Sequence, residues 1–173
     1  SQWYHKYTDY VIERGLMNGM SQEKFAPNGI LTRGQLVTIL HRLAGSPTPT
    51  GASPFTDVKE GRYYAEAGSW AAEQGLAQGV TETRFVPEAP ATREQLVTFL
   101  CRYAAMHGVD TAAGGSLSNF PDASSVSEYA QQPMLWAVQT GLLQGMDGRL
   151  APKASATRAQ TAAVIMRFCQ NVL

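Results

Sequence analysis

The stretch TREQLVTFLCR at residues 92–102 occurs twice more, as TRGQLVTILHR at 32–42 and, less closely, as TRAQTAAVIMR at 157–167. In each copy a threonine is followed three residues later by a glutamine and then by an apolar run. This is the capping-box pattern of a helix start. The sequence therefore predicts three equivalent helices whose N-caps are Thr32, Thr92 and Thr157, with box partners Gln35, Gln95 and Gln160.

An arginine directly follows the threonine in every copy, at Arg33, Arg93 and Arg158. The capping box does not explain these arginines, because a cation in the first turn lies at the positive end of the helix dipole. Two explanations are open. Each arginine could pair with a carboxylate of its own or the next repeat, such as Asp57 or Asp122, and clip the repeats together. Alternatively, it could join free helix N-terminal amides and a nearby loop cation in a site for a carboxylate or phosphate.

Upstream of each predicted helix lies a second repeated segment, which contains Gly-Leu-x-x-Gly, then a basic and an apolar residue, then a proline. The second glycines of these motifs are Gly19, Gly79 and Gly145, and the basic residues are Lys24, Arg84 and Arg149. An aromatic-bearing amphipathic stretch precedes each Gly-Leu and contains Trp70 or Trp136 in the second and third copies. These indoles could face a sugar ring or could pack in the core.

The repeats define the domain organisation: repeat 1 spans 1–45, repeat 2 spans 54–106 and repeat 3 spans 119–173. The linkers 46–53 and 107–118 are rich in Gly, Pro, Ser, Thr and Ala. Repeat 1 lacks the Phe-x-Asp that opens the other two, so we interpret it as N-terminally incomplete. Each repeat is predicted to consist of a helix, a loop and a second helix, and would be only marginally stable alone. The sequence therefore predicts one all-α domain, which is either a short solenoid or a closed pseudo-threefold bundle.

A third basic position recurs nine residues after each Thr-Arg arginine, at Arg42, Arg102 and Arg167. We expect these residues near helix C-termini, where the dipole favours a cation. Most of the positive charge of the chain is thus tied to the repeat.

Composition excludes several classes of function. Fourteen basic residues balance fourteen acidic ones in 173 residues, so no global field favours nucleic acid or an anionic membrane. No apolar run approaches the roughly 18 residues that span a bilayer. Three histidines without metal-ligand spacing, and the absence of a repeated catalytic arrangement, lead us to expect no metal, no cofactor and no enzyme. Cys101 and Cys169 occupy non-equivalent places and are expected to be unpaired buried thiols rather than a single bridge.

The N-terminal segment SQWYHKYTDY lacks the pattern of a signal peptide. The chain is therefore expected to be either a cytosolic protein or a piece of a longer exported one.

The ordered set of Phe-x-Asp, aromatic helix, Gly-Leu-x-x-Gly, basic-Phe-x-Pro and Thr-Arg-x-Gln resembles the S-layer homology domain in three tandem copies. The resemblance implies a pseudo-trimer in which one helix of each repeat joins a central three-helix bundle and grooves run between three prongs. It also implies an extracellular, wall-associated module that anchors an exported protein without a covalent bond. Gram-positive relatives recognise secondary cell-wall polysaccharide, often with ketal-linked pyruvate, and some Gram-negative relatives contact peptidoglycan-linked polymer.

The family motif is usually Thr-Arg-Ala-Glu, and glutamine replaces the glutamate in all three copies here. This change preserves the cap but leaves the arginine less neutralised. Repeat 3 has a shortened loop and Leu150 in place of phenylalanine, so its groove is the weakest candidate for a binding site. The missing Phe-x-Asp of repeat 1 makes the groove of that repeat a weaker candidate as well. The alternative functions are a helical protein-interaction module and self-assembly with other S-layer subunits, with the arginines as internal clips.

Overall fold

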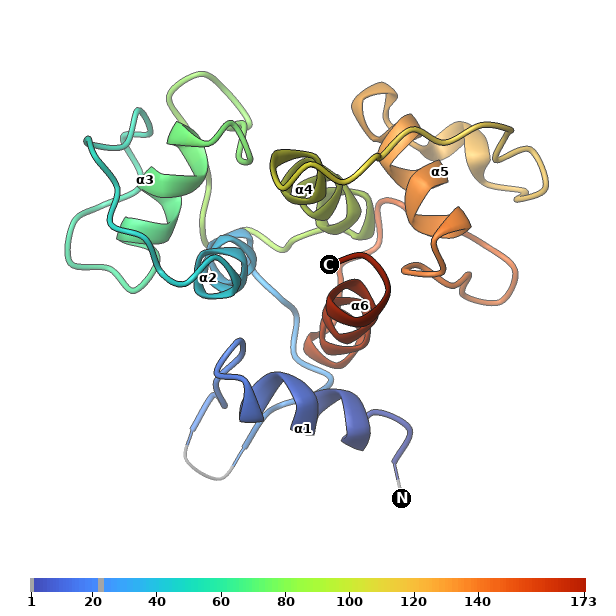
Figure 1. Cartoon of the computed structure of the whole chain (residues 1–173), viewed down its shortest axis with the longest axis horizontal. Coiled ribbons are helices and arrows are strands. Elements are labelled where there is room, and N and C mark those ends of the chain that lie inside the picture. The colour runs from blue at the N-terminus through green and yellow to red at the C-terminus, as the bar shows by residue number, and fades with distance from the viewer. Residues whose placement is uncertain (1, 22–23) are drawn as a thin grey trace.

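The computed structural model describes residues 2–21 and 24–173 and shows three inner helices surrounded by three outer ones (Figure 1). The inner helices are α2 (Arg33–Leu43), α4 (Arg93–Met106) and α6 (Arg158–Asn171). The outer helices are α1 (His5–Glu13), α3 (Ala65–Glu73) and α5 (Gln131–Gln139), and two single-turn helices, η1 (Ala123–Ser125) and η2 (Glu128–Ala130), precede α5. The described residues form no strands beyond isolated bridges, so the all-α prediction is confirmed.

The inner helices begin where the capping boxes predict. In α4 the Thr92 hydroxyl accepts a hydrogen bond from the Gln95 backbone N–H at 3.3 Å, and the Gln95 side-chain oxygen accepts one from the Thr92 N–H at 3.1 Å. The same reciprocal pair is present at the starts of α2 and α6. Each box satisfies donors that a helix start leaves without an intrahelical partner.

A ring of backbone hydrogen bonds joins the segments that precede the three inner helices. Leu31 N–H donates to the Ala156 carbonyl at 2.9 Å, Ala156 N–H to the Ala91 carbonyl at 2.8 Å, and Ala91 N–H to the Leu31 carbonyl at 2.8 Å. All three residues are fully buried. The ring therefore closes the chain into a pseudo-threefold arrangement, whereas the ends of a solenoid would stay apart.

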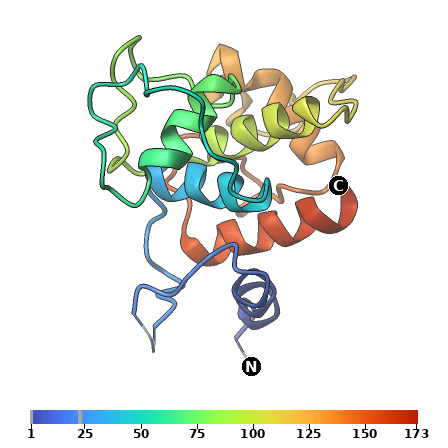
Figure 2. The same cartoon turned by 60° about the vertical axis from the view of Figure 1, so that its left-hand side comes forward.

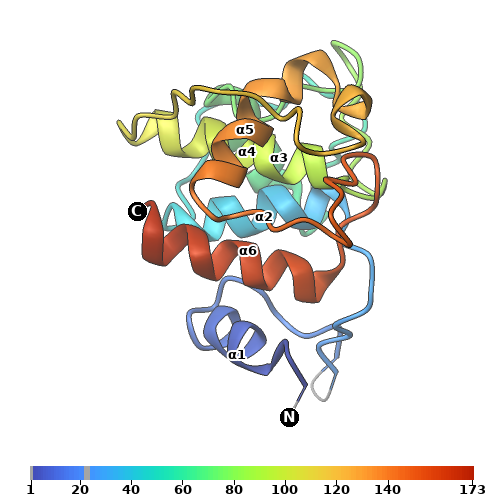
Figure 3. The same cartoon turned by 90° about the vertical axis from the view of Figure 1, so that its right-hand side faces the viewer.

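The outer helices pack on inner helices of neighbouring repeats. Helix α3 of repeat 2 packs on α2 of repeat 1, α5 of repeat 3 packs on α4 of repeat 2, and α1 of repeat 1 packs on α6 of repeat 3. Figure 3 shows α1 directly beneath α6, and Figure 2 shows α1 set apart from α2. Each prong is thus assembled from two repeats, and the first and last repeats meet.

The core lies between the inner helices and continues under each outer helix. Leu36, Leu40, Leu96, Leu100 and Phe168 are fully buried or nearly so. Burial of one such side chain contributes roughly 1.5–3 kcal/mol. The apolar faces that a single repeat would expose are covered only when all three repeats are present.

The loop after each outer helix begins in the same way in the three repeats. A glycine follows the C-cap residue of each outer helix, at Gly15, Gly75 and Gly141, and their φ angles of 65°, 69° and 73° are the left-handed values that glycine adopts without strain. A tight turn follows, closed in repeat 2 by the Val80 N–H donating to the Arg84 carbonyl at 2.8 Å. The loops then reach the starts of the inner helices.

Candidate ligand-binding grooves

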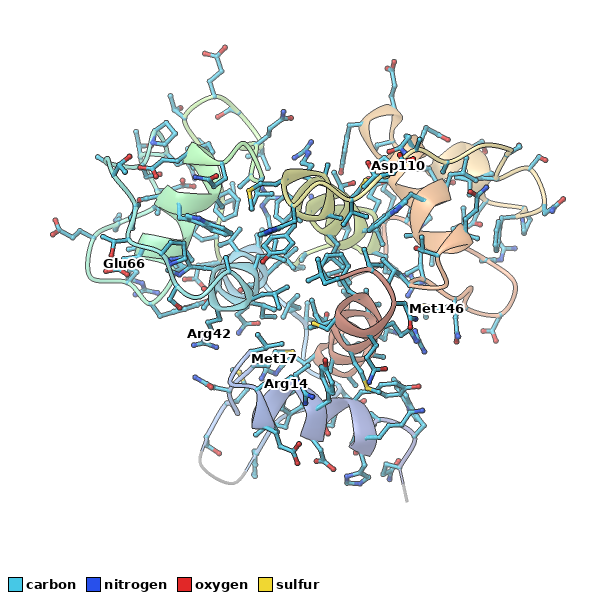
Figure 4. All side chains as sticks on the ribbon, in the orientation of Figure 1. Arg14, Met17, Arg42, Glu66, Asp110 and Met146 are labelled. Atoms are coloured by element: carbon cyan, nitrogen blue, oxygen red, sulfur yellow. The ribbon has the colours of Figure 1, made fainter. Side chains whose placement is uncertain are left out.

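Two cavities open beside inner helices and involve all three repeats. Groove 1, of about 340 Å³, is lined by residues 17–20, Gln35, Thr38, Ile39, Arg42, Tyr63 and Arg158. Groove 2, of about 320 Å³, is lined by residues 78–80, Gln95, Thr98, Phe99, Arg102, Tyr129 and Arg33. The two lists contain equivalent positions, and Figure 4 shows Arg42 and Met17 of groove 1 between α2 and α1.

The Thr-Arg arginines bind the loops of the next repeat in cyclic order. Arg33 of repeat 1 donates from Nε to the Phe85 carbonyl at 2.8 Å and from Nη2 to the Gln78 carbonyl at 3.2 Å. Arg93 makes the same pair of bonds to Leu150 and Gln144 at 2.9 and 3.0 Å. Arg158 closes the cycle by binding the Phe25 and Asn18 carbonyls of repeat 1. The arginines are therefore clips, but their acceptors are backbone carbonyls and not the carboxylates that the sequence suggested.

The helix N-terminal amides beside these arginines are occupied, which corrects the expectation that they would be free for an anion. In α4, Arg93 N–H donates to the Ala154 carbonyl at 2.9 Å and Glu94 N–H to the Pro152 carbonyl at 3.0 Å. The corresponding amides of α2 and α6 have equivalent acceptors. The converging carbonyl oxygens also explain why a cation is stable at the positive end of the dipole.

Burial has a clear electrostatic effect on the three arginines, each of which is 4% exposed. It lowers the pKa of Arg33, Arg93 and Arg158 from the ordinary value. Because arginine ordinarily titrates far above neutral pH, the guanidinium groups stay charged.

One nitrogen of Arg33 is available to a ligand. Its Nε and Nη2 bind carbonyls, whereas Nη1 has no hydrogen-bond partner among the described residues. In that part of the chain no side-chain nitrogen or oxygen is both fully buried and without a partner. Nη1 of Arg33 must therefore reach solvent, and groove 2 is the cavity that Arg33 lines.

The Phe-x-Asp carboxylates hold the loops from within their own repeats. The two Asp57 oxygens accept hydrogen bonds from the Phe85 and Val86 N–H groups at 2.9 and 2.8 Å. Asp122 binds the Leu150 and Ala151 N–H groups at 3.0 and 2.8 Å. Burial raises the pKa of both carboxyls, but the amide hydrogen bonds outweigh it, so both pKa values lie below the ordinary one. Neither carboxylate lines a groove.

The carboxylates and the arginines act on the same peptide groups. Ala26, Val86 and Ala151 have φ angles of 54°, 56° and 48°, which are strained for residues with a side chain. In repeat 2 this conformation directs the Phe85 carbonyl to Arg33 while the Phe85 and Val86 amides face Asp57. The two charged residues thus hold the strained loop from both sides.

The arginines at the third basic position, Arg42, Arg102 and Arg167, do not all lie at the helix C-termini where the sequence led us to expect them. Helices α4 and α6 continue beyond Arg102 and Arg167, so neither arginine lies in a last turn, whereas Arg42 does. Their guanidinium groups instead bind the carbonyls of the Gly-Leu leucines, with Nη1 to oxygen distances of 3.3 Å for Arg42 to Leu16, 3.1 Å for Arg102 to Leu76 and 3.4 Å for Arg167 to Leu142. Arg42 and Arg102 line grooves 1 and 2.

The loop cations lie outside the two grooves. Lys24, Arg84 and Arg149 are exposed, and Arg84 pairs with Asp57 at 3.3 Å.

The three glycines of the loop have a steric role. A Cβ on Gly79 would lie 2.2 Å from the Thr81 carbonyl oxygen, and one on Gly19 would lie 2.6 Å from that of Ser21. Gly145 is less crowded, with the Arg149 oxygen at 3.2 Å.

The aromatic walls of the grooves are tyrosines. Trp70 and Trp136 are 4% and 2% exposed and belong to the core, in agreement with the packing interpretation. Tyr63 and Tyr129, 56% and 48% exposed, line grooves 1 and 2. The repeat pattern places both tyrosines in register with Trp3, seven residues before Trp70 and Trp136, a spacing that would put them on the same helical face as the tryptophans. They are exposed instead because both precede the α-helices, which begin at Ala65 and Gln131.

Beside groove 2, bound to the hydroxyl of its Tyr129 wall, lies a buried carboxylate that the other repeats lack. Glu94 is 2% exposed and accepts hydrogen bonds from the Ser127 N–H and hydroxyl at 3.0 and 2.8 Å, from the Tyr129 hydroxyl at 3.2 Å and from Lys153 Nζ at 2.6 Å. Burial raises its pKa, but the bonds from Lys153 and Ser127 lower it more, so the pKa lies below the ordinary value. Gly34 takes this position in repeat 1, where a Cβ would lie 3.0 Å from the Tyr64 ring.

Among the described residues no group of three or more His, Cys, Asp or Glu side chains is placed to hold a metal ion.

Cys101 and Cys169 are unpaired thiols, the first buried and the second partly buried, and burial raises the pKa of both. No helix in the described ranges has the length and apolar character needed to cross a membrane.

Comparison with known proteins agrees with the three-repeat pattern. The family profile of the S-layer homology domain matches residues 1–37, 54–97 and 119–162. The chain is 30% identical over 166 residues to the surface-layer 125 kDa protein of Lysinibacillus sphaericus, covering 94% of this chain and 14% of that protein. It is 28% identical over 164 residues to an amylopullulanase of Thermoanaerobacterium thermosulfurigenes, covering 94% of this chain and 9% of the enzyme. It is 26% identical over 152 residues to a cellulosome-anchoring protein of Acetivibrio thermocellus, covering 85% and 34%.

This chain therefore spans only a small part of each of these relatives. The enzyme among them matches through this segment alone, so its catalytic activity gives no reason to assign one here. The family and these relatives indicate an extracellular location at the cell wall. Because the matched segments cover most of its length, the chain belongs to the S-layer homology family of cell-surface anchoring domains.

Proposed function

We propose that the chain anchors an exported protein to the bacterial envelope by binding secondary cell-wall polysaccharide in grooves 1 and 2. Each groove is lined by two arginines, the capping-box glutamine and a tyrosine, and no carboxylate lines either groove among the described residues. This local excess of positive charge, in a chain whose formal net charge is +0, is the observation that carries the proposal. It favours a ligand with an acidic group, such as the carboxylate of ketal-linked pyruvate.

The polar groups of groove 2 have complementary roles in this proposal. Arg33 offers Nη1, and Arg102 supplies a second positive charge across the groove. Gln95 uses its side-chain oxygen for the cap, which leaves its amide nitrogen as a donor. A carboxylate in the groove would therefore meet donors from Arg33, Arg102 and Gln95, and the Tyr129 ring offers an apolar face to the sugar that carries it.

The counterpart positions in repeat 3 support a weaker third groove. Ala163 stands where the other grooves have Thr38 and Thr98, which removes a hydroxyl. The Arg167 guanidinium lies over the Tyr7 ring, 5.4 Å from its centroid, and is thereby partly covered. We infer that grooves 1 and 2 are the main binding sites.

The proposal is tested by calorimetric titration of the chain with purified wall polysaccharide, either intact or stripped of its acidic substituents. We expect binding to the intact polymer and a loss of at least tenfold in affinity for the stripped one, because one charge-assisted contact contributes roughly 1.5–3 kcal/mol. Equal affinity for both polymers would contradict recognition of the acidic group. Failure to bind either would favour a protein partner, which includes assembly with other S-layer subunits.

Tyr63→Ala provides a matched variant for groove 1. The Tyr63 ring is exposed and its hydroxyl only approaches the Thr32 hydroxyl, at 3.4 Å, so its loss should leave thermal unfolding nearly unchanged. Affinity for the intact polysaccharide should fall. Tyr63→Phe, which keeps the ring, should bind close to the wild type.

A further inference from the structure

A third cavity adjoins groove 1, and the function proposed above assigns it no role. It has a volume of about 790 Å³ and lies between the first linker, the end of α2 and the start of α3. Thr38, Arg42 and Tyr63 line both this cavity and groove 1, so the two spaces are neighbours. We call it the linker cavity. Its volume lies within the range of ordinary ligand sites.

The linker cavity exists because repeats 2 and 3 differ in sequence at equivalent places. In repeat 3 the linker 107–118 contributes Val109, Ala113 and Leu117 to the core, and Leu135 of α5 packs there too. In repeat 2 none of the residues 46–53 is part of the core, and Ser69 of α3 stands where α5 has Leu135. The second linker lies against its outer helix, where Gln132 and Gln139 of α5 bind its carbonyls, whereas the hydrogen bonds of the first linker to α3 are confined to Glu73 at the end of that helix.

Hydrogen bonds hold the first linker in this position. The Ser46 N–H donates to the His41 carbonyl at 2.8 Å, and His41 Nε2 lies 2.7 Å from the Pro47 carbonyl oxygen. Further along, the Thr50 hydroxyl and the Gly51 N–H both donate to Glu73, at 3.0 and 2.6 Å. With both ends attached to helices, the linker forms a wall that exists before any ligand binds.

The chemistry of the linker cavity differs from that of groove 1. Its floor and walls carry the small residues Gly51, Ala52 and Ala65, together with the hydroxyl groups of Ser53 and Ser69. Two carboxylates, Glu60 and Glu66, line it as well, and Figure 4 shows Glu66 on α3. These carboxylates accept hydrogen bonds from hydroxyl groups. Because Arg42 and Arg62 line the cavity as well, it lacks the excess of positive charge that groove 1 has. The cavity is suited to sugar units that carry no acidic group.

We propose that the linker cavity is an additional subsite for neutral sugar units of the same polysaccharide whose acidic unit occupies groove 1. This inference rests on the proposed function of the grooves. Groove 1 with its extension would take a longer segment of the polymer than groove 2. The two grooves would then differ in their preference for fragment length, although their arginines are equivalent.

The test uses size-fractionated fragments of the wall polysaccharide, one containing a single repeating unit and one containing several, titrated into the full chain. The wild type should bind the longer fragment about tenfold more tightly than the short one, because one or two net hydrogen bonds to charged groups provide a gain of about this size. Ser69→Leu copies Leu135 into the linker cavity and should abolish this gain while affinity for the short fragment stays the same. Gln74→Leu adds the same side chain at the exposed residue that directly follows α3 and does not line the cavity, and should keep the gain.

A second variant distinguishes loss of the subsite from misfolding of Ser69→Leu. Glu66→Leu changes an exposed residue, so it should unfold at the wild-type temperature and also lose the gain with fragment length. A gain retained in both cavity variants, or absent in the wild type that binds the short fragment, would overturn the subsite and leave the proposed function intact. Failure of the wild type to bind either fragment would overturn both.

Discussion

At the scale of single residues, the same position of the repeat has been adapted differently at each junction. Gly34 makes room for Tyr64 between repeats 1 and 2, whereas Glu94 binds Ser127, Tyr129 and Lys153 between repeats 2 and 3. Ala130 stands at the place of Tyr64 in repeat 3, which leaves the space that the Glu94 carboxylate uses. A buried charge is thus tolerated because every donor around it is directed at it.

We predict that Glu94→Gln makes stability less dependent on acid pH. The folded-state pKa of Glu94 is lowered, so its contribution is fully present above the unfolded-state pKa of about 4.3 and disappears as pH falls through the lower folded value. The variant should lose about 1–2 kcal/mol at pH 7, because Lys153 is half exposed and solvent weakens the pair. Denaturant unfolding at pH 7, 5, 4 and 3 checks this, since the two proteins should converge toward pH 3. A difference that is constant with pH would show that Glu94 does not act through its charge.

At the scale of elements, each inner helix is attached to the loop of the following repeat by its first residues. The arginine side chain, two backbone amides and the ring of bonds through Leu31, Ala91 and Ala156 all cross this junction. The loop therefore serves two purposes, since it covers a helix start and also forms one wall of a groove. Stability and ligand binding share the same arginines.

This shared role changes the expected outcome of Arg93→Ala. The sequence alone predicts weaker wall binding without unfolding. Because Arg93 binds the Leu150 and Gln144 carbonyls in a buried site, we now expect a loss of stability as well, of about 2–4 kcal/mol. Arg93→Lys keeps the charge but cannot reproduce the planar fork, so it should recover only part of the loss. Thermal and denaturant unfolding measure both effects, and wild-type stability in either variant would contradict the clip.

At the scale of the whole molecule, the cyclic exchange of helices makes the three repeats one cooperative unit. Helix α1 packs on α6, and Arg158 binds the loop of repeat 1 across 133 residues of sequence. Removal of one repeat therefore exposes the core of another, and no pair of repeats retains a closed ring.

We predict that residues 1–106 do not fold as an independent domain. In this fragment α1 loses α6, α4 loses α5, and the ring of backbone bonds lacks Ala156. Far-UV circular dichroism should show reduced helix content, and heating should give no cooperative transition. The complete chain, measured alongside, should unfold in a single transition. A cooperative transition with full helicity in the fragment would show that two repeats are sufficient.

The sequence by itself determined the all-α class, the three helix starts, the unpaired thiols and the family, because capping boxes and repeated motifs are local patterns. Only the tertiary structure decided which outer helix packs on which inner helix, and that the arginines bind backbone carbonyls. Every residue has a carbonyl, so such an acceptor leaves no mark in the sequence. The tyrosine walls, the occupied helix amides and the linker cavity likewise depend on contacts between repeats. These contacts are set by how the three repeats close around one axis, which no single repeat encodes.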